Sequence, residues 1–488
     1  MSLFNREEVI DQNFTRWVVA GEFPKAKAKL YLSQDNIQKT DLISIFESQV
    51  ISRHIDIKAR ELKDKGDCFY TIGSSGHEGN AVFGRFFPYH DMAFLHYRSA
   101  PFFLERSKQI PNSTPIYDMA LSFMASSEDP ISGGRHKVIG SEVLNIPPQT
   151  STIASHLPKA VGTAFSIDRA RDLALSESKL VNESIVLCSF GDASANHAAA
   201  LSAFNTACWV SSQGGHVPIV FICEDNGTGI SVPTDGKWIE NNFSNKYGMQ
   251  YLKADGLHLI DLIVKTKEAE KICRLNRTPV FLHMETIRLM GHAGSDVEVG
   301  YRNIKEIEKD EANDPLIHSA RIMIENNCLT NEEVASLYEQ KRAQVGHVFE
   351  NATSRPKLKQ VDEVMSTIIS NKHVRTRPKY PSNDSREKIF GKEFGRLKLP
   401  HHMGKLINYA LTDILLQYSN TVIFGEDVAQ KGGVYHVTAD LYRQFGVRRV
   451  FNSPLDETSI IGFGIGLGHN GFVPIPEIQF LAYLHNAE

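Results

Sequence analysis

The sequence lacks a strong charge of either sign and lacks long apolar runs. Its 53 Lys and Arg residues nearly balance 57 Asp and Glu residues, which leaves a formal net charge of -4. A nucleic acid or an anionic membrane would favour a basic bias, so we expect neither as a partner. No apolar run reaches the roughly 20 residues that a bilayer-spanning helix needs. The first residues carry acids and lack the apolar core of a signal peptide.

Cysteine is also scarce, with six residues scattered along the chain and no CxxC pair. This spacing makes a zinc site or a disulfide framework unexpected, and it suits a reducing compartment. We therefore expect a cytoplasmic protein. At 488 residues and 42% hydrophobic content, the chain is long enough for two or three domains with large buried cores.

The first part of the chain shows helix and strand patterns in alternation. Residues 1–39 are polar and mixed, without a clear period, and we expect a surface extension there. Apolar residues recur every three to five positions over 40–65, which predicts an amphipathic helix. Short apolar runs at 184–190, 217–223 and 278–285 are separated by stretches long enough for helices, so they predict buried parallel strands.

A second alternating unit follows a change in composition. Residues 351–400 are rich in proline, basic residues and serine, which predicts a linker between domains. Strand-like and helix-like segments alternate again over 401–488, and the sequence stops soon after a strand. The fold class expected is α/β, with parallel sheets flanked by helices in two related domains. Because such a sheet normally continues, we expect the second domain to be cut short.

Polar residues follow two of the predicted strands. Asp192 comes directly after the first of them, and Asn226 and Thr228 come after the second. The carboxyl ends of parallel strands are where α/β sheets bind ligands. A carboxylate, an amide oxygen and the Thr228 carbonyl are hard donors that suit magnesium. Either residue alone would be a turn former or a helix cap, and only their combination predicts a metal site.

These two segments resemble the GDG…NN motif of proteins that bind thiamine diphosphate. Ala193 replaces the third-position glycine, and Asp225 stands where the family often has asparagine, but neither change removes a metal oxygen. HYRSA (96–100), ASHLPKAVGTAFS (154–166) and ETIRLMGHAGSD (285–296) follow the order found in the alpha subunits of branched-chain and pyruvate dehydrogenase components. The chain is similar to that family over about residues 40–350.

The resemblance implies thiamine diphosphate and Mg²⁺ as cofactors, with Asp192, Ala193 and Asn226 at the site. It also implies that Tyr97 and Arg98 contact the diphosphate and that His292 lies on an active-site loop. Without the family, the first two would be the surface end of a strand and the third an ordinary loop histidine. Regulated mitochondrial relatives carry a phosphorylatable serine where this chain has Ala293, so a kinase switch at that position is excluded.

Thiamine chemistry also needs a carboxylic acid against the cofactor's pyrimidine ring. Glu457 precedes an apolar helix of small residues, an environment that raises a carboxyl pKa, and Asp456 is its competitor. Residues 422–485 resemble the start of the beta subunit of the same enzymes. That resemblance implies that Glu457 is the activating acid and that Gln479 and Tyr483 line the aminopyrimidine pocket. On the segment alone, Glu457 would be an ordinary acid at a helix N-terminus.

One further pattern could indicate a dinucleotide cofactor, but the elements predicted around it argue against such a site. Residues 466–471 read GxGxxG, which can mark a dinucleotide site. That site needs a strand before the glycines and a helix after them, whereas the order predicted here is reversed. We therefore expect these glycines to permit close packing of helices.

The activity implied is oxidative decarboxylation of a 2-oxo acid and transfer of the acyl group to the lipoyl group of an acyltransferase component. GHEG (76–79) and the GHAGSD loop favour a branched-chain, 2-oxoisovalerate-like substrate. A pyruvate or acetoin dehydrogenase component, or a catalytically inactive fragment, remains the alternative. In the family the beta half continues beyond the length present here, so we expect a truncated fused chain that forms a homo-oligomer.

Overall fold

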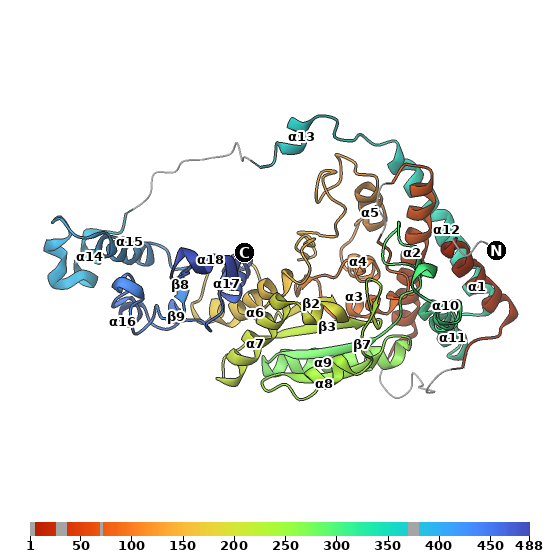
Figure 1. Cartoon of the computed structure of the whole chain (residues 1–488), viewed down its shortest axis with the longest axis horizontal. Coiled ribbons are helices and arrows are strands. Elements are labelled where there is room, and N and C mark those ends of the chain that lie inside the picture. The colour runs from red at the N-terminus through yellow and green to blue at the C-terminus, as the bar shows by residue number, and fades with distance from the viewer. Residues whose placement is uncertain (1–4, 26–36, 69–71, 369–379) are drawn as a thin grey trace.

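Five parallel strands form the central sheet of the first half of the chain, in the order β1-β2-β3-β7-β6. Figure 1 labels β2, β3 and β7 of this sheet. This computed structural model describes residues 5–25, 37–68, 72–368 and 380–488. The strands are β1 (Met92–Phe94), β2 (Val186–Gly191), β3 (Ile219–Asp225), β6 (Gln250–Asp255) and β7 (Val280–Glu285). The three apolar runs are confirmed as the central strands β2, β3 and β7, and all neighbouring pairs are parallel.

Helices cover both faces of this sheet because its central strands are apolar on both sides. Along β3, Val220 and Ile222 belong to one hydrophobic core, and Phe221 and Cys223 belong to the other. The first core takes in α2 (Lys39–Asp64), α3 (Ala81–Phe86) and α9 (Leu259–Asn276), and the second takes in α6 (His156–Asp172) and α7 (Ala198–Ser212). The helix predicted over 40–65 is therefore confirmed as α2. Burial on two faces explains why the strands read as unbroken apolar runs.

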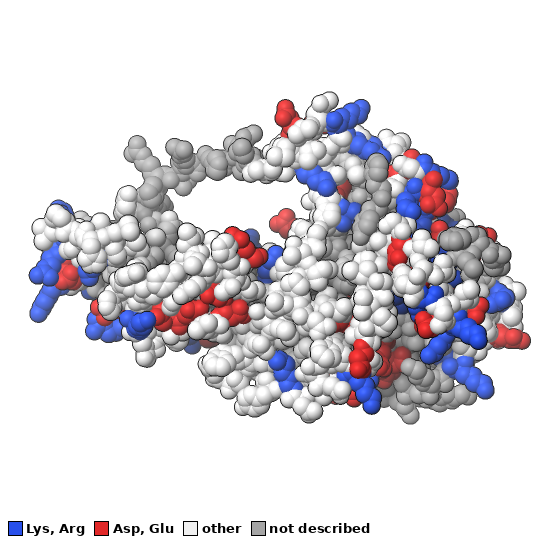
Figure 2. All heavy atoms as spheres, in the orientation of Figure 1, with Lys and Arg blue, Asp and Glu red and all other residues white. Residues whose placement is uncertain are grey.

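Eight further elements of the first half lie outside this sheet and its covering helices. They are α4 (Ala100–Ser107), α5 (Pro115–Phe123), β4 (Thr228–Gly229), β5 (Val232–Pro233), α8 (Trp238–Phe243), α10 (Ile304–Glu311), α11 (Pro315–Glu325) and α12 (Asn331–Thr353). Basic and acidic side chains both occur across the face shown in Figure 2, in keeping with the small net charge.

A surface extension without a clear period is predicted for residues 1–39, but residues 6–20 form a helix. α1 (Arg6–Ala20) is a helix whose N-terminus is capped by the Asn5 side chain. It buries Ile10, Phe14 and Val18, spaced four residues apart, and it packs against α12. This period is weak in the sequence because three buried apolar side chains carry it among polar and charged neighbours.

The second unit is a smaller α/β assembly. Its parallel sheet has the order β10-β8-β9 and contains β8 (Thr421–Gly425), β9 (Val450–Asn452) and β10 (Val473–Pro476). Its helices are α15 (Met403–Gln417), α16 (Leu441–Phe445), α17 (Glu457–His469) and α18 (Leu484–Ala487). No described helix combines the length and the apolar character that crossing a membrane requires.

The segment predicted as a linker contains short helices. They are α13 (Val361–Met365) and α14 (Asn383–Phe390), and neither buries a residue. Figure 1 shows α13 beside the first unit and α14 at the far end of the second. Residues 369–379 of the predicted linker lie outside the described residues.

The two halves pack together through glycines on α6 and α17. A Cβ added at Gly162 would lie 2.6 Å from the Cα of Phe463, and one added at Gly466 would overlap the backbone carbonyl of Lys159. Phe424 and Phe463 of the second unit share a hydrophobic core with α6. Of the GxGxxG glycines, Gly466 confirms the prediction of close helix packing. A Cβ added at Gly468 would meet nothing within 4 Å, and one added at Gly471 would overlap the backbone of Glu177, which lies outside α6.

Candidate cofactor site

A cavity of about 780 Å³ lies at the carboxyl ends of β2 and β3. Its wall contains residues 191–194 after β2, residues 226 and 228–230 after β3, and His292 after β7. Residues 96–97, 136–138 and 149–151 complete much of the remainder. A cavity with converging polar groups at this edge of a parallel sheet is the usual place for a ligand.

The predicted metal ligands Asp192, Asn226 and Thr228 all line this cavity. Asp192 is 1% exposed, and its Oδ2 has no hydrogen-bond partner among the described residues. Burial raises the pKa of Asp192, and the neighbouring charge of Asp225 acts in the same direction. A cation would offset both effects. The unpartnered carboxylate oxygen, together with amide and carbonyl oxygens, fits Mg²⁺.

A series of hydrogen bonds through His77 and Glu224 fixes the orientation of the Asn226 side chain. Asn226 Oδ1 accepts from the backbone N–H of Thr228 at 3.1 Å, and its Nδ2 lies 3.0 Å from His77 Nε2. His77 Nδ1 lies 2.7 Å from Glu224 Oε2, which also accepts from Asn80 Nδ2 at 3.2 Å. The sequence reasoning did not assign His77 or Glu224, although both stand within segments that it singled out.

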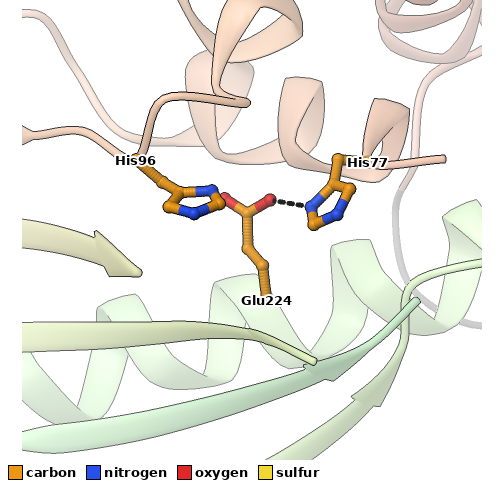
Figure 3. Close-up of side chains that lie close together, drawn as sticks. All are labelled: His77, His96 and Glu224. Carbon is orange, nitrogen blue, oxygen red and sulfur yellow. Dashed lines mark hydrogen bonds and ion pairs between the residues drawn. The ribbon is translucent and has the colours of Figure 1, made fainter. Parts of the chain in front are cut away.

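His96 lies on the other side of the Glu224 carboxylate from His77 (Figure 3). One ligand atom from each of these three buried residues lies within 4.8 Å of the others. Among the described residues, neither ring nitrogen of His96 nor Oε1 of Glu224 has a hydrogen-bond partner. Burial lowers the pKa of both imidazoles well below the ordinary value and raises the pKa of Glu224. Both histidines are therefore neutral at pH 7.

Tyr97, predicted to meet the diphosphate, and His292, predicted on an active-site loop, both line the cavity, whereas Arg98 does not line it but contacts both residues. Arg98 Nη2 donates to the carbonyl of His292 at 3.0 Å, and the Arg98 guanidinium lies 5.1 Å from the Tyr97 ring centroid. Arg98 is 2% exposed, and no described residue accepts a hydrogen bond from its Nε. Burial lowers the pKa of His292 to about 4, and the charges of Arg98 and Arg288 contribute. The group presents one buried cation and a neutral imidazole, which suits a phosphate ligand.

Ala193 and Gly229 occupy one small space beside the metal ligands. A Cβ added at Gly229 would lie 2.7 Å from the Cβ of Ala193. The alanine that departs from the family's glycine is therefore accommodated by a glycine across the loop.

This contact predicts the result of a double-mutant cycle. Gly229→Ala should lower the free energy of unfolding by about 1–3 kcal/mol through overpacking, and should weaken Mg²⁺ and thiamine diphosphate binding. Adding Ala193→Gly should restore both, as measured by thermal unfolding and titration calorimetry. Gly236→Ala is the matched control, because a Cβ there meets nothing within 4 Å. Equal effects of Gly229→Ala with and without Ala193→Gly would contradict the explanation.

Lys137 supplies a cation in the wall of the cavity. Its Nζ lies 4.6 Å from the Phe123 ring centroid, and burial lowers its pKa. In the described part of the chain, no carboxylate forms an ion pair with this ammonium group. Val138 and Ile153 supply apolar surface to the same wall. The cavity therefore offers both a cation and apolar surface to a ligand.

The three residues predicted from the second half lie elsewhere. Of the described residues, those that line the cavity fall between Ile72 and His292, so the wall does not include Glu457, Gln479 or Tyr483. Glu457 begins α17 with 9% exposure, and its Oε2 accepts from Asn486 Nδ2 at 3.5 Å. Burial raises the pKa of Glu426, and the negative charge of Glu457 acts in the same direction. The roles of these three residues remain predictions.

Comparison with known proteins finds two family matches. Residues 47–361 match the family described as dehydrogenase E1 component, and residues 400–488 match the transketolase pyrimidine binding domain. The chain is 25% identical over 333 residues to a 2-oxoisovalerate dehydrogenase alpha subunit of Caenorhabditis elegans, which covers 67% of this chain and 72% of that protein. It is 24% identical over 322 residues to a Bacillus subtilis alpha subunit of the same name, covering 65% of this chain and 92% of that one.

A different relative matches the second half. The chain is 47% identical over 85 residues to a 3-methyl-2-oxobutanoate dehydrogenase beta subunit of Mycobacterium tuberculosis. The match covers 17% of this chain and 24% of that subunit. One chain therefore carries matches to both types of subunit.

Proposed function

Because the chain belongs to the dehydrogenase E1 component family, we propose that it catalyses oxidative decarboxylation of a branched-chain 2-oxo acid. The substrate proposed is 2-oxoisovalerate or a close analogue, and the acyl group passes to a lipoyl group of an acyltransferase component. The names of the alpha-type and beta-type relatives support this choice.

The observation that carries the proposal is the buried, unpartnered Oδ2 of Asp192 in the cavity beside Asn226. A buried carboxylate oxygen without a partner is unfavourable unless a cation compensates it. Asp192, Asn226 and the Thr228 carbonyl would hold Mg²⁺, which in turn binds phosphate oxygens. Tyr97 and Arg98 would contact the diphosphate, with Ala193 beside it, and His292 would act as a catalytic residue on the loop near the diphosphate and the acyl group.

Thiamine diphosphate, when bound, supplies the nucleophilic carbon and the electron sink that loss of carbon dioxide requires. We assign binding of the diphosphate and the cation to residues 40–350, and binding of the pyrimidine ring to residues 401–488. Glu457 would hold a proton against that ring, and Gln479 and Tyr483 would line its pocket. Since the cavity wall is formed without them, we propose that a second copy of the chain supplies these groups in a homo-oligomer.

The cavity also suits the proposed substrate. Lys137 has no carboxylate partner in the described part of the chain, so an anion from solution can compensate its charge. Val138 and Ile153 offer apolar contact for a branched side chain. We place the enzyme in the cytoplasm, where a reducing environment suits the buried thiols of Cys188 and Cys223, whose pKa burial raises.

Substrate competition tests this function. The protein, loaded with thiamine diphosphate and Mg²⁺, should release carbon dioxide from 2-oxoisovalerate with a higher kcat/KM than from pyruvate. It should acylate a lipoyl domain in the same assay, whereas acetoin should not compete. A large preference for pyruvate or acetoin would overturn the substrate choice. Absence of turnover with every 2-oxo acid, despite bound cofactor, would overturn the enzyme assignment.

A further inference from the structure

The side-chain amide of Asn226 contacts a hydrogen-bond donor at its oxygen and a hydrogen-bond acceptor at its nitrogen. Its Oδ1 accepts a hydrogen bond from the Thr228 backbone N–H, which can only donate. Its Nδ2 faces His77 Nε2 at 3.0 Å. An amide nitrogen donates and does not accept, so the imidazole nitrogen at this contact carries a lone pair. Rotating the amide by half a turn would set donor against donor and acceptor against acceptor.

The tautomer of His77 follows from that contact. Since Nε2 accepts, the proton of the neutral ring lies on Nδ1, which donates to Glu224 Oε2 at 2.7 Å. His77 and Glu224 are both fully buried, so water cannot substitute for either partner. The imidazole is therefore fixed in one tautomer by the carboxylate behind it (Figure 3).

Glu224 is itself held in place by an amide of defined orientation. Asn80 Nδ2 donates to Glu224 Oε2 at 3.2 Å and to the carbonyl of Arg98 at 3.0 Å. Asn80 Oδ1 accepts from the Phe102 backbone N–H at 2.9 Å. The series from Phe102 through Asn80 and Glu224 to His77 is therefore directional at every contact.

We propose that His77, oriented by Glu224, is a positioning residue that presents Asn226 Oδ1 to the bound cation. The inference rests on the proposed function, in which Asn226 is a ligand of Mg²⁺. The amide oxygen has two lone pairs, so it can serve the cation while it accepts from Thr228. Partners that orient metal ligands commonly contribute 10- to 100-fold to metal affinity.

The test compares Mg²⁺ affinity with stability in variants of the full chain. His77→Phe keeps the ring but removes both nitrogens, and it should weaken Mg²⁺ binding by about 10- to 100-fold in titration calorimetry at saturating thiamine diphosphate. His77→Gln offers an acceptor oxygen and a donor nitrogen, so it should recover most of the affinity. Glu224→Leu should behave like His77→Phe, and Glu224→Gln should stay close to the parent because its amide oxygen still accepts.

A matched control separates positioning from folding. His54 is a buried histidine whose Nε2 lies 2.9 Å from the carbonyl of Tyr338, and it does not line the cavity. His54→Phe should lower the thermal midpoint of the chain without ligands while leaving Mg²⁺ affinity unchanged. In an Asn226→Ala background, His77→Phe should have little further effect on Mg²⁺, because the residue through which it acts is gone.

Each contrary outcome has a distinct meaning. A parent chain that binds no Mg²⁺ with thiamine diphosphate overturns the proposed function and this inference together. If Asn226→Ala weakens Mg²⁺ binding and His77→Phe does not, the inference alone fails. It also fails if the purified parent holds a stoichiometric transition metal that His77→Phe loses, because His77, His96 and Glu224 would then be its ligands.

Discussion

Replacing Asp192 with asparagine is expected to weaken binding of Mg²⁺ with thiamine diphosphate by at least about 100-fold and to remove decarboxylation. Loss of one partner of a buried charge pair costs about 3 kcal/mol or more, which corresponds to two decades in a binding constant. The same substitution should raise the thermal midpoint of the chain without cofactor, because it removes a buried carboxylate whose Oδ2 has no partner. Calorimetric titration and thermal unfolding, with and without cofactor, measure the two opposite effects.

The stability gain should also depend on pH. Burial raises the pKa of Asp192 in the folded chain above that of the unfolded chain. The protonated form is therefore favoured by folding at low pH, and this contribution is lost as the pH rises through the folded-state pKa. Asp192→Asn should consequently stabilise the cofactor-free chain most near neutral pH and least in acid.

Asp129 provides the matched control for Asp192. It is also a buried aspartate, but its carboxylate accepts hydrogen bonds from the backbone N–H groups of Ile131 and Ser132, both at 3.1 Å. Asp129→Asn should lower the thermal midpoint and leave Mg²⁺ affinity unchanged. Unchanged Mg²⁺ affinity in Asp192→Asn would remove Asp192 from the proposed metal site.

The strands that the sequence predicted were those with the simplest environment. β2, β3 and β7 are covered on both faces, so burial alone dictates an unbroken apolar run. β1 has only three residues, and β6 contains Gln250 and Lys253 at the sheet's edge, where one side need not be apolar. Their positions come from pairing with neighbours far along the chain, which no local pattern records.

The residues of the candidate site also fall into two groups, those that the strand pattern predicts and those that only the folded structure brings together. Asp192, Asn226 and His292 follow strands of one parallel sheet, so the fold itself gathers them at one edge. His77 and Glu224 are 147 positions apart, and their hydrogen bond depends on how the segment before α3 lies over the end of β3. The sequence placed both within recognised segments but could not pair them.

Replacing Glu457 with glutamine is expected to lower kcat by about 10²- to 10⁴-fold while Mg²⁺ and thiamine diphosphate still bind. The amide keeps the shape of the side chain but cannot hold and release the proton that the aminopyrimidine ring requires, and loss of a general acid–base group costs about this much. The diphosphate and cation groups lie in the other half of the chain, so affinity should change little. Decarboxylation kinetics and calorimetric titration of the same preparation separate the two effects.

Asp456→Asn is the neighbouring control for Glu457→Gln and should leave turnover near that of the parent.

A mixture of two variants tests whether Glu457 acts in its own subunit or in a partner. Since Glu457 lies outside the cavity wall of its own chain, a mixture of Asp192→Asn and Glu457→Gln chains should regain turnover that neither has alone. With random pairing in a symmetric dimer, about a quarter of the sites would combine two intact halves. Full turnover by Glu457→Gln alone would exclude this residue as the activating acid, and no recovery in the mixture would exclude a site shared between copies.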